Sequence, residues 1–137
     1  MEHKVAYLQM IQAVIARMAS NSFLIKGWSV TLVAALFALA AAGTNELFVY
    51  LAYFPAFMFW ALDAFFLRQE HLFRELWNQA RELDAEIDFS MDTEPFTDQV
   101  DSTWSVARSH TLALFHGTIT GTIVIAMLLM LADKHLW

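Results

Sequence analysis

Hydrophobic residues gather in three long stretches that are separated by two polar segments of very different length. The stretch 111–132 contains no formally charged side chain, and a helix of that length crosses a hydrocarbon core of roughly 30 Å. The stretch 46–67 has similar length if Asp63 is tolerated near its end. The stretch 23–43 also spans if the Lys26 ammonium extends to the headgroups. The pattern therefore predicts three transmembrane helices over these ranges.

The first segment, residues 1–22, has a helical period of its own. Its apolar positions recur at three- and four-residue spacing, and its polar side chains share a narrower side. The apolar positions are Val5, Leu8, Ile11, Ile15 and Met18, and the polar ones are Gln9, Gln12 and Arg17. We expect an amphipathic helix that lies in the membrane interface, packs on the bundle or lines a vestibule. No proline separates it from Gly27, so it is either a separate helix or continuous with the first span.

Two polar segments of different character follow the second span. Residues 68–81 keep the helical period and mix arginine with glutamate, so we expect the second helix to extend beyond the membrane. Residues 82–110 begin with a dense run of carboxylates, and Pro95 interrupts any helix there. This acidic loop is either a solvated connector or a segment that docks a basic partner or attracts cations. The partner or gating candidates of these two segments are Asp84, Glu86, Asp88, Arg74 and Trp77.

Basic residues mark the side of the membrane on which each polar segment lies. Lys and Arg precede the first span and recur between the second and third, whereas the turn between the first two spans has none. By the positive-inside rule, the N-terminus and the acidic loop are expected to be cytoplasmic, and the tail 133–137 to lie outside. Pro55, inside the second span, removes a backbone donor and is expected to kink that helix.

Composition agrees with a membrane protein and removes several classes of function. Of 137 residues, 58% are hydrophobic and 16% charged, which is too apolar for an ordinary soluble domain. There is no cysteine, no sequence motif of a nucleotide-binding or hydrolytic enzyme, and no metal-ligand spacing among the histidines. We therefore expect no enzyme, cofactor or metal site. The net charge of −6 also argues against direct nucleic-acid binding.

Ionisable and polar residues inside the spans are the candidate functional residues. Lys26 and Asp63 lie at comparable depth on antiparallel helices, and we predict that they form an ion pair, within or between subunits. In the third span, Gly117 and Gly121 form a GxxxG pattern, which favours close helix packing. His116 and Thr120 lie about one turn apart, and they either support this packing or line a polar conduit as pore-lining residues.

Two parts of the chain resemble a known family. The sequence RMASNSFLIKGW at 17–28, and FWALDAFFLRQE at 59–70 followed by FRELW, are similar to small bacterial SLATT-like membrane effectors of anti-phage defence, and to the membrane component of the Hailong nucleotidyltransferase system. The resemblance covers residues 14–81. It implies an oligomeric pore in the bacterial inner (plasma) membrane that a cytoplasmic nucleotidyltransferase or nucleotide signal opens, so that the cell is depolarised.

An oligomer is also expected on physical grounds, because three helices are too few to enclose a water-filled path alone. The leading hypothesis is an all-α, three-span, homo-oligomeric channel in the lipid bilayer. The alternative is a non-conducting membrane anchor or assembly subunit that recruits a cytoplasmic partner through its acidic loop and the second-span extension.

Overall fold

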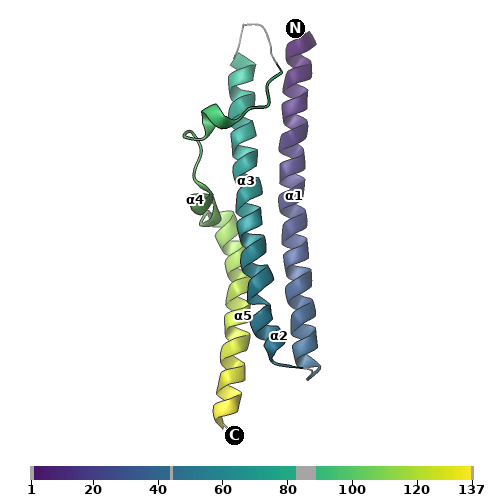
Figure 1. Ribbon diagram of the computed structural model, residues 1–137, viewed down its shortest axis with the longest axis vertical. Helices are drawn as coiled ribbons and strands as arrows, with labels where there is room; N and C mark the ends of the chain where they lie inside the picture. Colours follow the sequence, from purple (N-terminus) through teal and green to yellow (C-terminus); the bar gives the residue numbers. More distant parts are fainter. Residues whose placement is uncertain (1, 44, 83–88, 137) are drawn as a thin grey trace.

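The computed structural model describes residues 2–43, 45–82 and 89–136, and helices make up most of this part of the chain. No strand occurs in these ranges. The elements are α1 (Glu2–Ala41), α2 (Leu47–Leu51), α3 (Tyr53–Glu82), the 3-10 helix η1 (Glu94–Phe96), α4 (Thr103–Ala107) and α5 (His110–Leu136), as Figure 1 shows.

Three helical segments are long and apolar enough to cross a membrane. They are Glu2–Ala41, Leu47–Glu82 and His110–Asp133, which contain the three predicted spans. At a rise of about 1.5 Å per residue, α1 is roughly 60 Å long, about twice the thickness of the hydrocarbon core. The apolar window of α1 lies in its second half, so a membrane crossing by this helix would leave its first half outside the hydrocarbon core. The class predicted from hydropathy, an all-helical protein with three candidate spans, is confirmed.

The first helix runs without a break from residue 2 into the first candidate span. Of the two alternatives that the sequence allowed, the continuous helix is the one observed. Its first half packs against the extension of α3, where Tyr7, Ile11 and Ile15 form a buried cluster with side chains of α3 and the loop. We call this the extension core, and its other buried members are Leu72, Leu76, Ala80 and Phe96. Val5, on the same predicted apolar face, remains half exposed.

The second span is interrupted at Ala52, between α2 and α3. Pro55 explains the position of the break, because it has no N–H with which to bond the carbonyl of Leu51 one turn earlier. The chain stays nearly helical through the break, since the Ala56 amide donates to the Ala52 carbonyl at 3.2 Å. The structure thus shows a one-residue interruption just before the proline, at Ala52.

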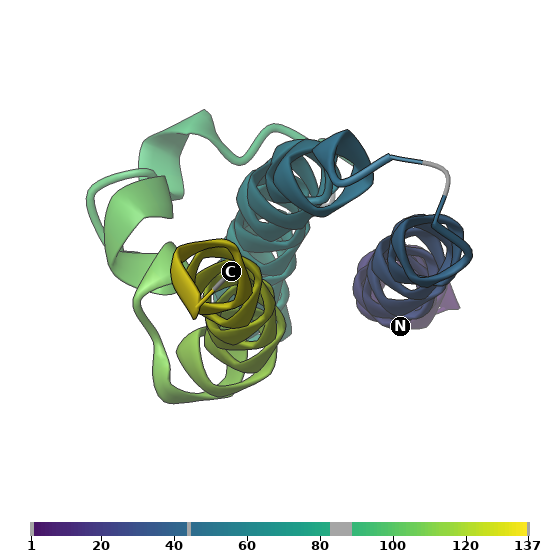
Figure 2. The ribbon, with the colours of Figure 1, turned by 90° about the horizontal axis from the view of Figure 1, so that it is seen from below.

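The three long helices are arranged as an open row with α3 in the middle. Figure 2 shows α1, in purple and blue, and α5, in yellow-green, on different sides of α3. The helices α1 and α5 touch each other far less than either touches α3. A single chain therefore leaves a groove between α1 and α5 instead of closing a three-helix bundle.

The described part of the acidic loop folds back along α3. Phe96 of η1 is buried in the extension core, and Val106 of α4 is buried with Ala64 and Leu112. This part of the loop is thus a packed segment and not a free connector. The candidates Asp84, Glu86 and Asp88 lie outside the described residues.

Candidate functional site

Polar side chains from all three spans meet at one point between the helices. Ser22 and Lys26 lie one turn apart on the same face of α1, Asp63 comes from α3, and His116 comes from α5. We call these four residues the charge cluster. They meet because α1 and α3 run antiparallel, and because α5 begins beside the middle of α3.

The carboxylate of Asp63 is the centre of the charge cluster. Its side chain is fully buried, and its Oδ2 lies 2.5 Å from the Lys26 Nζ. The Ser22 hydroxyl donates to Oδ1, and the Lys26 ammonium also donates to the Ser22 Oγ at 2.9 Å. The ion pair predicted from equal depth is therefore confirmed, and it forms within a single chain.

His116 completes the charge cluster from the third span. Its Nε2 lies 2.7 Å from Asp63 Oδ2, the oxygen that also accepts from Lys26. The ring is fully buried, so within one chain it faces α3 and not an open path; the sequence had left a packing role and a pore-lining role open for it. A proton on Nε2 would be donated to the carboxylate in this geometry.

Aromatic rings surround the histidine on its other sides. The Trp60 ring stacks on His116 with centroids 5.8 Å apart, and Phe115 meets it edge-on at 5.1 Å. The Trp60 indole donates to the carbonyl of Ala107 at 2.8 Å, which fixes the stacked ring and joins α3 to the end of α4. His116 Nδ1 has no hydrogen-bond partner among the described residues. The rings of Trp60 from α3 and Phe115 from α5 therefore provide apolar surface around His116.

Burial makes the members of the charge cluster depend on one another. A carboxylate in an apolar interior is stable only when it is paired and hydrogen-bonded, and Asp63 receives donors from both α1 and α5. The Asp63 carboxylate thereby ties the two outer helices to the middle one.

Lys26 is the most exposed member of the charge cluster. Its side chain is 19% exposed and lines a groove of about 710 Å³ between α1 and α5. We call this the α1–α5 groove, and its other lining residues are Val30, His110, Thr111, Leu114, Phe115, Thr118 and Ile119. Lys26 Nζ lies 5.8 Å from the centre of the Phe115 ring. A solute or a second chain in the groove would therefore meet an ammonium, two threonines and a mainly apolar wall.

The glycines of the third span do not mediate helix packing within the chain. Among the described residues, a methyl group on Gly117 or Gly121 would meet no atom within 4 Å, so close approach at these glycines is not seen inside one chain, and the predicted packing between copies stays a prediction. The helix α5 instead contacts α3 through other residues, among them Leu112, His116 and Ile123. The Thr120 hydroxyl is buried without a partner among the described residues and does not line the α1–α5 groove.

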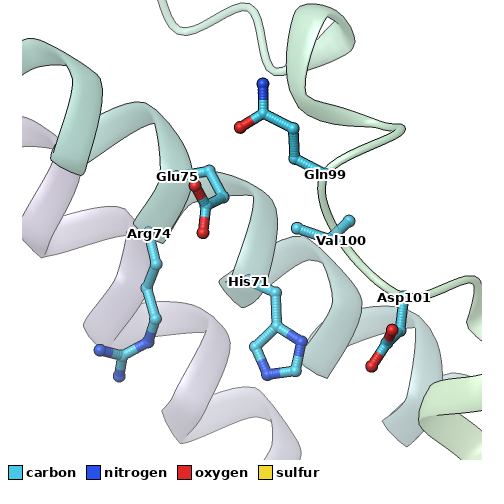
Figure 3. Close-up of a pocket in the computed structure, with 6 residues that line it drawn as sticks. All are labelled: His71, Arg74, Glu75, Gln99, Val100 and Asp101. Atoms are coloured by element: carbon cyan, nitrogen blue, oxygen red, sulfur yellow. The ribbon is translucent and has the colours of Figure 1, made fainter.

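The extension of α3 carries the remaining candidates. Arg74 forms an ion pair with Glu70 one turn earlier, at 2.8 Å. Trp77 packs on the extension core, and the Arg81 guanidinium lies 5.2 Å from the centre of the Trp77 ring. Beside them is a pocket of about 230 Å³, whose lining residues Figure 3 shows. They are His71, Arg74, Glu75, Gln99, Val100 and Asp101. Both signs of charge line this small, open pocket, so it does not favour one ligand class.

Two members of the charge cluster were not identified from the sequence. Ser22 precedes Lys26 by one helical turn, which is the spacing that lets a hydroxyl share the partner of a lysine. His116 lies near the same end of its span as Asp63 does of its own, so equal depth was an available signal. The described residues contain no group of three or more side chains able to hold a metal ion.

Fold and site together define an all-helical protein with three candidate membrane spans and a buried charge cluster where the spans meet. Comparison with models of known protein families, with curated proteins and with solved structures gives no match.

Proposed function

We propose that this protein is a homo-oligomeric ion pore of the bacterial inner membrane, with its N-terminus in the cytoplasm. The observation that carries the proposal is the α1–α5 groove. The Lys26 side chain lines this groove and lies within the first candidate span, at membrane depth. The pore wall in this proposal is the groove itself, so Lys26, Thr111 and Thr118 replace His116 and Thr120 as the lining residues.

The energetics of the groove favour water or another chain over lipid. An ammonium in the hydrocarbon region costs on the order of 3 kcal/mol, and such groups usually face a bundle interior or a water-filled cavity. The opposite side of α1 is suited to lipid instead, with Leu24 53% exposed and Trp28 59% exposed. Several copies arranged around an axis would turn each groove inward and these apolar side chains outward.

The resemblance of residues 14–81 to SLATT-like effectors supports the same proposal. It adds opening by an upstream nucleotide signal or by a nucleotidyltransferase partner. The extension core provides a rigid pair of helices beyond the membrane through which such a signal can act on the spans, because α1 is continuous from Tyr7 to Lys26. Movement of the first half of α1 would thus shift the ammonium that faces the groove.

Flux through purified protein in liposomes tests the pore. Thr118→Val removes a hydroxyl from the groove with little change in size, and Thr31→Val is the matched control on the lipid-facing side of α1. In both threonines the hydroxyl donates a hydrogen bond to the carbonyl four residues earlier. Each substitution therefore removes the same kind of bond within its helix, and only the effect on the groove differs. In the presence of the signal or partner, we expect wild-type protein to conduct, Thr118→Val to change conductance several-fold, and Thr31→Val to match wild type.

Absence of flux, from a wild-type protein that assembles normally and is tested with its signal or partner, would overturn the pore and favour the second candidate, a non-conducting anchor. The projecting pair formed by the first half of α1 and the extension of α3 is the observation behind that candidate. Equal effects of the two threonine variants would instead move the conducting path away from the α1–α5 groove.

A further inference from the structure

A second groove lies on the other side of α3, between α3 and α4. It has a volume of about 680 Å³, within the range of roughly 300–1,000 Å³ typical of small-ligand sites. We call it the α3–α4 groove. It is lined by Phe57, Trp60, Ala61, Ala64, Thr103, Trp104, Ala107 and Arg108.

The walls of the α3–α4 groove are held in place by specific contacts. The hydrogen bond from the Trp60 indole to the Ala107 carbonyl fastens α4 to α3, and Val106 is buried beneath α4. The Ser102 side chain caps α4 by accepting from the Ser105 amide at 3.2 Å. On the α3 side, Ala61 and Ala64 leave the space that larger side chains would fill. The groove is thus a formed feature of the fold.

The lining is apolar along its length and cationic at one end. The described residues that line the groove include no carboxylate. Arg108 is exposed, forms no ion pair with any described residue, and holds its guanidinium 5.8 Å from the centre of the Trp104 ring. Trp104 itself is 71% exposed. An arginine stacked on an aromatic ring keeps its donors free for a phosphate.

The position of the groove along the spans points to lipid as its occupant. Arg108 directly follows α4 and lies two residues before α5 begins, so it lies where the third apolar helix starts. The α3 lining extends from Ala64 to Phe57, which is roughly 10 Å at 1.5 Å per residue and runs into the second span. Headgroups and exposed tryptophan meet at this level of a bilayer, and basic pockets between helices bind anionic headgroups.

We propose that the α3–α4 groove binds one phospholipid with an anionic headgroup, whose phosphate contacts Arg108 and whose acyl chain lies along Phe57, Ala61 and Trp104. The proposal does not rest on the pore, because a bound lipid would fix α4 on α3 in a conducting or a non-conducting protein. It accounts for a cation that no described carboxylate pairs and for an indole left uncovered.

Lipid retention by purified full-length protein tests this site. After reconstitution in vesicles of equal phosphatidylglycerol and phosphatidylcholine, native mass spectrometry counts the lipids that remain bound. We expect wild-type protein to retain phosphatidylglycerol in preference. Arg108→Gln should lower that preference several-fold, and Ala61→Phe, at an exposed position beside the groove, should reduce retention of both lipids. Arg81→Gln is the matched control, because Arg81 also lies over a tryptophan ring but outside the groove.

A second measurement keeps the test independent of any folding defect. Brominated acyl chains on the lipid retained in detergent should quench Trp104 fluorescence in the wild-type protein, and the quenching should decrease in Trp104→Phe, where Trp60 still lines the groove. Inorganic phosphate should not displace the lipid, since it supplies no acyl chain. Retention unchanged in both Arg108→Gln and Ala61→Phe, or displacement by phosphate alone, would overturn the proposal.

Discussion

At the scale of single residues, Asp63 decides how the three spans are joined. Its carboxylate accepts from Ser22 and Lys26 on α1 and lies 2.7 Å from His116 on α5. Each partner alone would be an isolated polar group at membrane depth, whereas together they neutralise and hydrogen-bond one another. A buried group with partners on two other helices couples the energies of all three, so substitutions in the charge cluster should be strongly non-additive.

Removing one member of the ion pair should cost far more than removing both. We expect Asp63→Leu and Lys26→Met each to destabilise the protein by about 3–5 kcal/mol, because each leaves a buried polar or charged partner, and the double variant to cost less than the sum. Denaturation in detergent measures this cycle. The exposed pair Arg81 and Glu82 serves as the control, and its double variant should change stability by under about 1 kcal/mol. Strict additivity at Lys26 and Asp63 would contradict the coupling.

At the scale of elements, the continuity of α1 is the main structural feature. A helix this long is stabilised over its first half by the extension core and over its second half by packing on α3 in the membrane. The second span and the loop that follows it are divided into shorter helices instead. Proline interrupts the second span at Ala52, and the short helix α4 is held in place by tertiary contacts with α3 and α5.

The extension core should determine whether the first half of α1 stays attached to α3. Ile11 is fully buried there, so Ile11→Ala should cost about 2–5 kcal/mol of local stability and increase amide hydrogen exchange in the first half of α1. Val5→Ala, at a half-exposed position of the same helix, should change exchange little. Equal protection in the two variants would mean that the pair of helices does not depend on this core.

At the scale of the whole molecule, most of the apolar surface of the spans is uncovered. Only 11% of the most apolar window of α1 and of α5 is buried within the chain. Lipid covers such surface in a membrane, and contacts between copies can cover part of it. Since Gly117 and Gly121 meet nothing inside the chain, any packing role they have belongs to contacts between copies.

Substitution of these glycines should therefore separate folding from assembly. Gly117→Leu should leave the fold of each chain intact, because the added side chain enters open space, while it reduces crosslinking between copies if the GxxxG face forms the interface. Leu129→Ile, on an exposed part of the same helix, is the control. Helical content and thermal stability in dilute detergent report folding, and crosslinking in vesicles reports assembly. Loss of helical content in Gly117→Leu would contradict the uncovered position of the glycine.

The sequence alone determined the number, type and approximate extent of the spans, and it identified the pair Lys26 and Asp63. Hydropathy is summed along the chain, so it predicts a span without knowledge of how the helix is rotated. The position of a single charge within an apolar stretch likewise gives its depth in the membrane without that knowledge. The break near Pro55 was predictable for the same reason, because the missing N–H is local.

Only the tertiary structure decided which faces meet. It turned His116 toward Asp63, placed Gly117 and Gly121 where an added Cβ would meet no described atom within 4 Å, and joined residues 2–22 to the first candidate span in one helix. The physical reason is that an apolar span offers every side of its helix almost equally to lipid and to protein. The rotation of each helix then follows from packing and from a few buried hydrogen bonds, which residues far apart in the sequence form together.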